Sequence, residues 1–260
     1  MDSPQTRAAQ AGPPFETALS LLRRRGDFRP LSTGSPELDR LTGGLDPGLF
    51  YLFYGDEDGG LPDRLVHGLL VEAVKEPGAR AVYVVCGNYR RSRTVMDNEL
   101  LLSLIDAAGL DIDDALSRIH IVFAFSERHL IRAPRLVEGV LEEGEGFTLV
   151  AVQQLTKLFY GERALRHEDP AEFTGVVSRL REMCSEAGIV LAASGRPTGS
   201  RRPIPAPEGG TFLKHAANAI FYMREARRGP MTAHVVKHPD RARTGTFIQF
   251  GEGGGAFWGG

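Results

Sequence analysis

An apolar segment followed by a glycine-rich turn, at residues 48–62, constrains the fold of this chain most. The segment reads Gly-Leu-Phe-Tyr-Leu-Phe-Tyr over 48–54, and Gly-Asp-Glu-Asp-Gly-Gly-Leu-Pro follows over 55–62. A buried strand, a glycine-rich turn and a helix start, in that order, are the setting of a phosphate-binding loop. We therefore predict the scaffold of a nucleotide site at this point of the chain.

The residues that carry the chemistry of such a loop are replaced. Gly55 and Gly60 keep the spacing of the pattern G-x-x-x-x-G-K-[ST], but Leu61 stands in place of the Lys and Pro62 in place of the Ser/Thr. In a working loop the Lys reaches the terminal phosphates and the hydroxyl binds Mg²⁺. Acidic residues at 56–58 also oppose the positive potential of an anion site. We expect no catalytic residue, no cofactor and no metal here.

Composition places the chain among globular proteins without a nucleic-acid charge signature. It has 260 residues and a formal charge of −2, which suits one α/β domain with short appendages. Cys86 and Cys184 are both flanked by apolar residues and are expected to be free buried thiols. We see no secretory leader and no apolar run long enough to span a bilayer, and so expect a cytoplasmic protein.

Apolar strand segments alternate with helical segments along the chain. The predicted strands are 81–86, 119–125, 147–152 and 189–193, the predicted helices are 65–74, 95–108, 131–141 and 171–187, and a final antiparallel set covers 217–223, 232–237 and 245–250. This alternation predicts an α/β fold with a mostly parallel sheet and helices on both faces.

Several segments together resemble the ATPase core of the RecA/RadA recombinase family, including shorter paralogues such as RadB. The resemblance covers roughly residues 15–250 and is carried by 32–39, Gly43-Gly44, 80–84, Asn88, 119–125, Leu155-Thr156, Phe159, 207–217 and Lys237-His238. It implies a RecA-like P-loop fold with a C-terminal antiparallel extension. We expect a disordered tail and linker helix at 1–30, the core domain at 31–250, and a flexible Gly-rich tail at 251–260. Trp258 in that tail is either a docking residue or simply tucked or frayed.

Two further positions depart from what the resemblance implies. In the family, the strand matching 149–152 ends in an Asp that orients the Mg²⁺ shell, and here Gln153 stands there. The strand matching 82–85 is followed in the family by a Glu that activates water, and here Gly87 takes that place. Phosphoryl transfer depends on positioning and charge neutralisation. We expect the chain to be a pseudo-ATPase.

A partner-binding motif is retained. Phe15-Glu-Thr-Ala18 resembles the F-x-x-A motif by which one RadA subunit docks on the next, and its distance from Thr33 fits the family. An alternative is that Phe15 packs on its own domain. The receiving pocket in the family is lined by small residues, whose places Val122 and Ala124 take here. The larger Val122 predicts a narrowed acceptor, so the chain would join a filament end rather than extend it.

Two loops correspond to the family's single-stranded DNA contacts. The candidate DNA-binding residues are Arg163 and Arg166 in the first loop, and Arg196, Arg201 and Arg202 in the second. Mobile basic loops follow a phosphate backbone, although ordinary solvated loops have the same composition. A possible contact with a neighbour's nucleotide involves Lys237, His238 and Arg241.

The resulting hypothesis is a catalytically inactive RecA-family paralogue that binds a RadA-type recombinase, or itself, through Phe15 and Ala18. It would modulate the recombinase filament on single-stranded DNA in homologous recombination and repair. One alternative is a KaiC-like signalling or scaffold module without DNA. Another is a residual nucleotide-binding ATPase with unconventional ligands.

Overall fold

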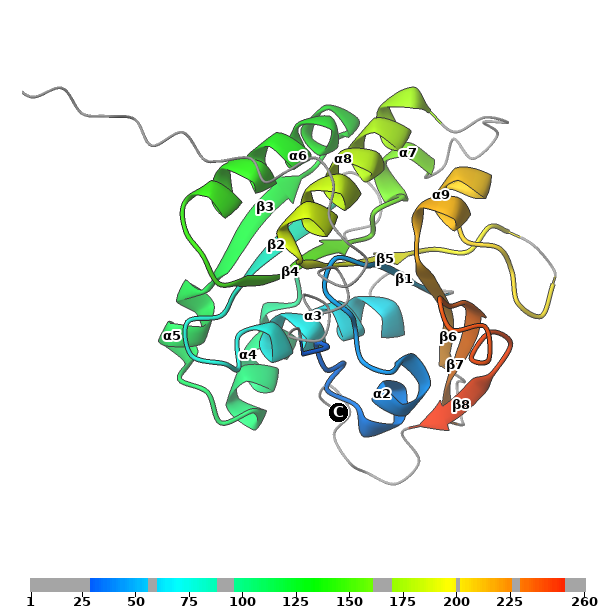
Figure 1. The fold of residues 1–260 in the computed structure, drawn as a ribbon, viewed down its shortest axis with the longest axis horizontal. Coiled ribbons are helices and arrows are strands. Elements are labelled where there is room, and N and C mark those ends of the chain that lie inside the picture. The colour runs from blue at the N-terminus through cyan, green and yellow to red at the C-terminus, as the bar shows by residue number, and fades with distance from the viewer. Residues whose placement is uncertain are drawn as a thin grey trace, which may run out of the picture.

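The apolar segments of the sequence form one eight-stranded sheet (Figure 1). The structure is a computed structural model, and it describes residues 29–55, 60–87, 96–160, 170–199, 202–225 and 230–250. Its order is β3-β2-β4-β5-β1-β6-β7-β8. The strands are β1 Phe50–Gly55, β2 Arg80–Cys86, β3 Ile119–Ala124, β4 Phe147–Gln153, β5 Val190–Gly195, β6 Ala219–Glu225, β7 Met231–Lys237 and β8 Phe247–Phe250.

The sheet is parallel from β3 to β6, and β7 and β8 then run antiparallel. The predicted mostly parallel sheet with an antiparallel extension is therefore confirmed. The predicted antiparallel set corresponds to β6, β7 and β8, whose successive pairings are antiparallel, and β6 also pairs parallel with β1 on its other side. The pairing changes from parallel to antiparallel at β6 because its other neighbour, β7, directly follows it in the sequence and returns beside it.

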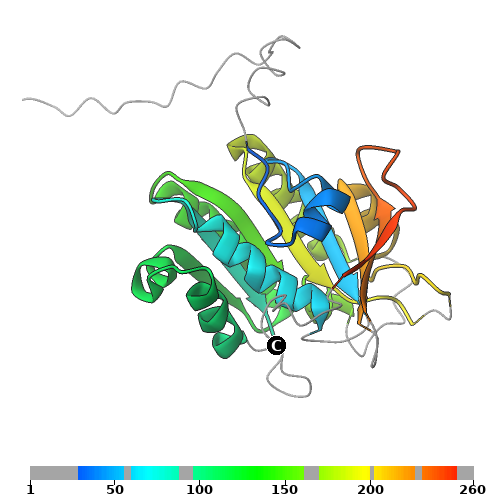
Figure 2. The same cartoon turned by 90° about the horizontal axis from the view of Figure 1, so that it is seen from below.

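Eight helices accompany the sheet within the described residues. They are α2 Pro36–Thr42, α3 Leu61–Ala73, α4 Asn98–Ala107, α5 Ile112–Ser117, α6 Glu127–Glu142, α7 Lys157–Tyr160, α8 Ala171–Ala187 and α9 Gly210–Ala216. Side chains of α2, α3, α4 and α5 join the core on one face of the sheet, and those of α6, α8 and α9 join the core on the other. Figure 2 shows the sheet between these two layers.

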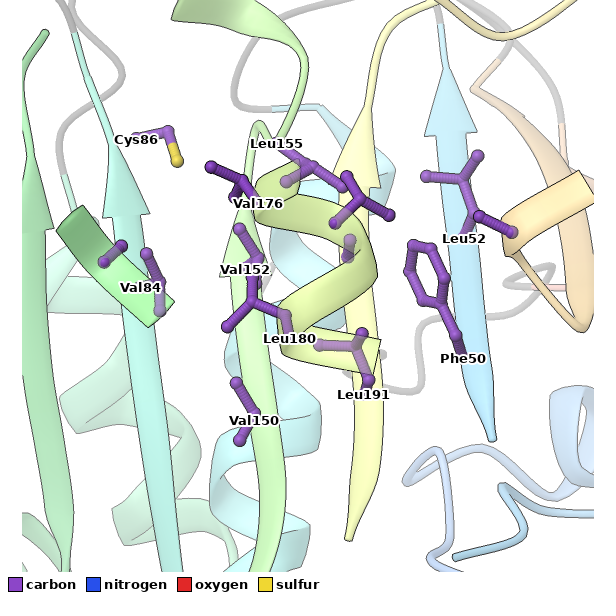
Figure 3. Close-up of a cluster of buried hydrophobic side chains, with 14 of the residues drawn as sticks. Phe50, Leu52, Val84, Cys86, Val150, Val152, Leu155, Val176, Leu180 and Leu191 are labelled. Atoms are coloured by element: carbon purple, nitrogen blue, oxygen red, sulfur yellow. The ribbon is translucent and has the colours of Figure 1, made fainter. Parts of the chain in front are cut away.

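The central strands are apolar on both faces because both faces are covered, as expected for a parallel sheet. Figure 3 shows one of the two cores, where Phe50 of β1, Val152 of β4 and Leu191 of β5 meet Leu180 of α8. All four side chains are buried. Helix α3 packs on the opposite face across β1, β2, β4, β5 and β6, so the start of α3 is fixed relative to the ends of these strands.

The short helix α2 is held by its own polar residues. The Ser35 side chain caps its first turn by accepting a hydrogen bond from the backbone N–H of Leu38. The carboxyl group of Asp39 accepts from the backbone N–H of Thr33 at 2.8 Å and from the Ser32 hydroxyl at 2.6 Å. This part of the Thr-Gly-Ser segment therefore has a structural role in the described chain.

Candidate functional site

A cluster of buried polar side chains lies where the parallel strands end and α3 begins. Its members are Asp63, His67, Tyr83, Gln153, Gln154 and Ser194. The carboxyl ends of parallel strands are the usual place of a ligand site in an open α/β sheet. This cluster occupies the position at which the sequence predicted a nucleotide site without its chemistry.

Asp63 is the centre of the cluster. It is the third residue of α3, after Leu61 and Pro62, and it is only 2% exposed. Its carboxyl group accepts a hydrogen bond from the Ser194 hydroxyl at the end of β5. The side-chain amide of Gln154 donates to both carboxyl oxygens, at 3.0 and 2.9 Å. The start of α3 is thereby tied to the ends of two strands.

The backbone of Gln154 is strained to make these contacts. Its φ of 55° is the one positive value among the non-glycine residues that the structure describes. The left-handed conformation costs an L-residue about 1–2 kcal/mol. Two bonds to Ser194 hold the backbone there, from the Gln154 N–H to the hydroxyl at 2.8 Å and from the Leu155 N–H to the carbonyl at 3.0 Å. The Oε1 atom of Gln154 is buried and has no hydrogen-bond partner among the described residues.

A second branch of the cluster contains Gln153. The Tyr83 hydroxyl donates to its Oε1 atom and also lies 3.3 Å from Nε2 of His67. Nδ1 of His67 lies 2.8 Å from the carbonyl oxygen of Asp63, so this nitrogen carries the proton. Burial lowers the pKa of His67 and raises the pKa of Tyr83. Both groups are therefore held in their neutral forms.

The described part of the degenerate phosphate loop is closely packed. A Cβ atom on Gly55 would lie 2.5 Å from the carbonyl oxygen of Met223 and 2.9 Å from Cγ of Pro62, so only glycine fits beside this helix start. Gly60 is the N-cap residue directly before α3, and Leu61 and Pro62 are buried in the first turn of the helix. Residues 56–59 lie outside the described residues.

The other position predicted to have lost a catalytic group is also buried. Gly87 directly follows β2, and its backbone N–H donates to the carbonyl of Ala124 at 3.0 Å. Within the described residues, no group of three or more His, Cys, Asp or Glu side chains could bind a metal ion. Cys86, next to Gly87, is a free buried thiol like Cys184, as predicted, and burial raises the pKa of each to about 12.

Only part of the predicted DNA-binding set can be placed. Arg196 is paired with Glu208 at 3.3 Å, and Glu208 also accepts from the Thr156 hydroxyl at 2.9 Å. Through Glu208, the Arg196 side chain is therefore linked to Thr156, which follows the end of β4, and it does not extend freely into solvent. Arg202 is exposed. Arg163, Arg166 and Arg201, and the partner-binding residues Phe15 and Ala18, lie outside the described residues.

The three residues proposed to face a neighbour's nucleotide lie at the end of β7 and in the turn that follows it. The Lys237 amine donates to three carbonyls at the end of α9, those of Lys214 at 2.8 Å, Ala217 at 2.5 Å and His215 at 3.4 Å. Nε2 of His238 lies 3.0 Å from the carbonyl of Thr42 at the end of α2. Both side chains thus stabilise helix ends, whereas Arg241 is exposed in the following turn.

A pocket of about 660 Å³ opens between the edge strand β3 and helix α6. It is lined by Phe123, Phe125, His129, Arg132, Arg135 and Leu136. Phe123 is 50% exposed, and its ring stacks on Phe125 with centroids 5.4 Å apart. Val122 and Ala124, the predicted lining residues, point into the core beneath α6 instead, because side chains alternate along a strand.

The sequence reasoning missed Asp63, His67, Tyr83, Gln154 and Ser194 as members of the site. Two signals were available: an acidic residue directly after Pro62, just before the predicted helix, and a pair of glutamines at a strand end. The remaining members could not be found from the sequence because their contacts span up to 131 residues along the chain.

No protein-family model matches the sequence. The chain is similar to a protein named "DNA repair and recombination protein RadA" from Methanoculleus marisnigri, with 28% identity over 256 residues, covering 87% of this chain and 74% of that relative. None of the helices that the structure describes has the length and apolarity needed to cross a membrane. This similarity over most of both chains supports homology of the chain to the RecA/RadA recombinase superfamily, and the mostly parallel sheet is consistent with a RecA-like fold.

Proposed function

We propose that this protein is a RecA-family paralogue that does not hydrolyse ATP, binds a RadA-type recombinase and modulates its filament on single-stranded DNA in recombination and repair. The similar protein from Methanoculleus marisnigri is named for DNA repair and recombination. Fold alone does not define function, so the proposal depends on the cluster around Asp63.

The observation that carries the proposal is the place of the Asp63 carboxyl group. The N-terminus of a helix attracts anions because its backbone N–H groups are unpaired and its dipole is positive there. In the first turn of α3 the chain itself supplies an acidic group, the Asp63 carboxyl group, which accepts hydrogen bonds from Gln154 and Ser194. A phosphate brought to this position meets an acidic side chain and the amide Gln153, where a nucleotide site needs a cation and a metal-binding carboxylate.

The pocket beside β3 supports binding to a recombinase subunit. In the RadA family the receiving pocket for the F-x-x-A motif lies at the strand that corresponds to β3. Here the pocket combines the stacked rings of Phe123 and Phe125 with Leu136 of α6, which is 53% exposed. Buried aromatic and aliphatic anchors commonly provide most of the binding energy of an interface. A neighbouring subunit can therefore contact this chain at the pocket as well as through Phe15.

Nucleotide titration tests the first half of the proposal. Calorimetry with Mg²⁺-ATP and a phosphate-release assay should both give background values for the purified protein, with the resident recombinase as the positive control. Phosphate release that disappears when Gly60 and Leu61 are substituted would contradict the proposal, because it would locate hydrolysis at the loop.

A binding experiment with the recombinase tests the second half. Leu136→Asp should weaken binding of the recombinase at the pocket, while Leu116→Asp should leave it unchanged. Leu116 is the matched control because it is an exposed leucine, at 38%, on α5 rather than at the pocket. If the wild-type protein neither binds the recombinase nor changes the length of its filaments on single-stranded DNA, the modulator role is wrong.

A further inference from the structure

A row of four aromatic rings crosses the C-terminal half of the sheet. Tyr54, Tyr222, His234 and Phe247 are neighbours in register on β1, β6, β7 and β8. Successive ring centroids lie 5.2, 6.2 and 5.3 Å apart, and the last two rings are stacked with 22° between their planes. The row begins in the core, where the Tyr54 hydroxyl donates to the carbonyl of Pro205 at 2.8 Å.

The row ends on the surface. Phe247 is 58% exposed, which makes it the most exposed large apolar side chain among the residues that the structure describes. The opposite face of β8 is covered, because α2 packs against this strand and Ile248 packs against the core there. β8 is also the last strand of the sheet (Figure 1), and its sequence Phe-Ile-Gln-Phe has none of the charges that usually protect an edge strand.

The sequence that follows β8 has the composition of a tether with an aromatic end. Residues 251–260 read Gly-Glu-Gly-Gly-Gly-Ala-Phe-Trp-Gly-Gly, and Trp258 is the only tryptophan of the chain. Eight residues of a glycine-rich chain have a root-mean-square reach of about 16 Å. Phe247 lies three strand residues before Phe250, a distance of about 10 Å. The reach of about 16 Å exceeds the span of about 10 Å, so Trp258 can return to Phe247, and the short connection gives a high effective concentration.

We propose that Phe257 and Trp258 dock in cis on the exposed ring of Phe247 beside His234, and so extend the aromatic row beyond the edge of the sheet. Aromatic rings stack favourably in offset or edge-to-face arrangements. The docked segment would cover Phe247 and lie along the open edge of β8. This inference is independent of the proposed recombination function, because it concerns only the chain's own C-terminal segment.

Trp258 is a built-in probe for the test, since it is the chain's single tryptophan. Its emission maximum and its quenching by acrylamide are measured on the full chain in buffer and in urea. We expect blue-shifted emission and protection from acrylamide in the folded protein. Phe247→Ala should abolish this protection and raise quenching to the level of the unfolded chain, whereas Phe247→Tyr, which keeps the ring, should preserve it.

Phe123→Ala is the matched control. Phe123 is a comparably exposed phenylalanine, at 50%, on β3 at the opposite edge of the sheet, so its loss should leave the Trp258 signal unchanged. Circular dichroism establishes that each variant is folded. Because Phe247 is mostly exposed, its truncation should not unfold the domain.

Four results would overturn the proposal. Trp258 could be as accessible in the folded protein as in urea, or its protection could survive Phe247→Ala, which would place it elsewhere. Protection that rises with protein concentration would show docking on a second copy. Protection that appears only when single-stranded DNA is added would assign the exposed rings to base stacking instead.

Discussion

Replacing Asp63 by alanine tests whether the cluster at the start of α3 now has a structural role. The buried carboxyl group accepts hydrogen bonds from the Ser194 hydroxyl and from the Gln154 amide, the latter at 3.0 and 2.9 Å. Asp63→Ala removes the acceptor and leaves both donors without it in a buried position, since Asp63 is only 2% exposed. It also removes the acidic group from the first turn of α3.

The expected loss of stability follows from these two donors. Leaving a buried donor unsatisfied costs about 1–3 kcal/mol, so two donors give about 2–6 kcal/mol, with a central value of about 4 kcal/mol. For a chain of this size each 1 kcal/mol lowers the melting temperature by about 2–4 °C, which predicts a decrease of about 8–16 °C.

Urea unfolding followed by circular dichroism measures this change. Asp63→Asn is the matched variant, and we expect it to lose about 1 kcal/mol, the value of one ordinary hydrogen bond. Its loss is small because the Gln154 amide can turn and bring its unpaired Oε1 atom to the new amide. Glu182→Ala is the surface control, since this residue forms an ion pair with Arg179 in which both side chains are exposed, at 57% and 48%, and such pairs contribute little to stability. If Asp63→Ala is within about 1 kcal/mol of the wild type, the structural interpretation of the cluster is wrong.

Three further predictions concern pH, partner binding and DNA. Burial lowers the pKa of His67 below 6.5, so the unfolded chain binds a proton more readily than the folded one. The free energy of unfolding should therefore fall as the pH drops through about 6.5, and His67→Gln should flatten this slope in urea unfolding measured at several pH values. Phe15→Ala should weaken recombinase binding roughly 30- to 1,000-fold in interferometry, with an unchanged melting temperature; a destabilised variant that still binds would refute this role. Arg202→Ala should lower the affinity for single-stranded DNA and reduce its salt dependence in fluorescence anisotropy. Arg196→Ala, which removes a contact with Glu208, should change both less, and equal effects would contradict this distinction.

The strands could be predicted because burial on both faces produces uninterrupted apolar segments. The predicted strand at 81–86 and the structure's Arg80–Cys86 differ by one residue, and the helix at Ala171–Ala187 has the predicted bounds. The helices α2, α5, α7 and α9 were missed because each has seven residues or fewer, too short for a periodic apolar face. Local caps define two of them, the side chains of Ser35 for α2 and Asp111 for α5.

The sequence was sufficient to identify which positions depart from the pattern of a phosphate-binding loop, but not which side chains form the buried cluster there. Leu61, Pro62 and Gln153 could be recognised as departures because the pattern of a phosphate-binding loop is defined by residue type and spacing. The contact between Asp63 and Ser194 joins residues 131 positions apart, and only the register of β4 and β5 brings Gln154 beside them. In the same way, the pairing of Arg196 with Glu208 depends on how its loop folds back, which composition does not encode.

The side chains of the cluster are physically coupled. An acidic group at position 63 is compatible with a helix N-terminus, but it would repel both a bound phosphate and a second carboxylate at the end of β4. Glutamine at 153 removes that repulsion and accepts the Tyr83 hydroxyl, while glutamine at 154 supplies the two N–H bonds that a buried carboxyl group needs. Each side chain lowers the cost of burying the others, since Asp63 without Gln154 would be a buried acceptor lacking these donors. Restoring a lysine at 61 or an aspartate at 153 alone would therefore add a charge to a cluster arranged without it. We therefore expect neither single substitution to give ATP hydrolysis.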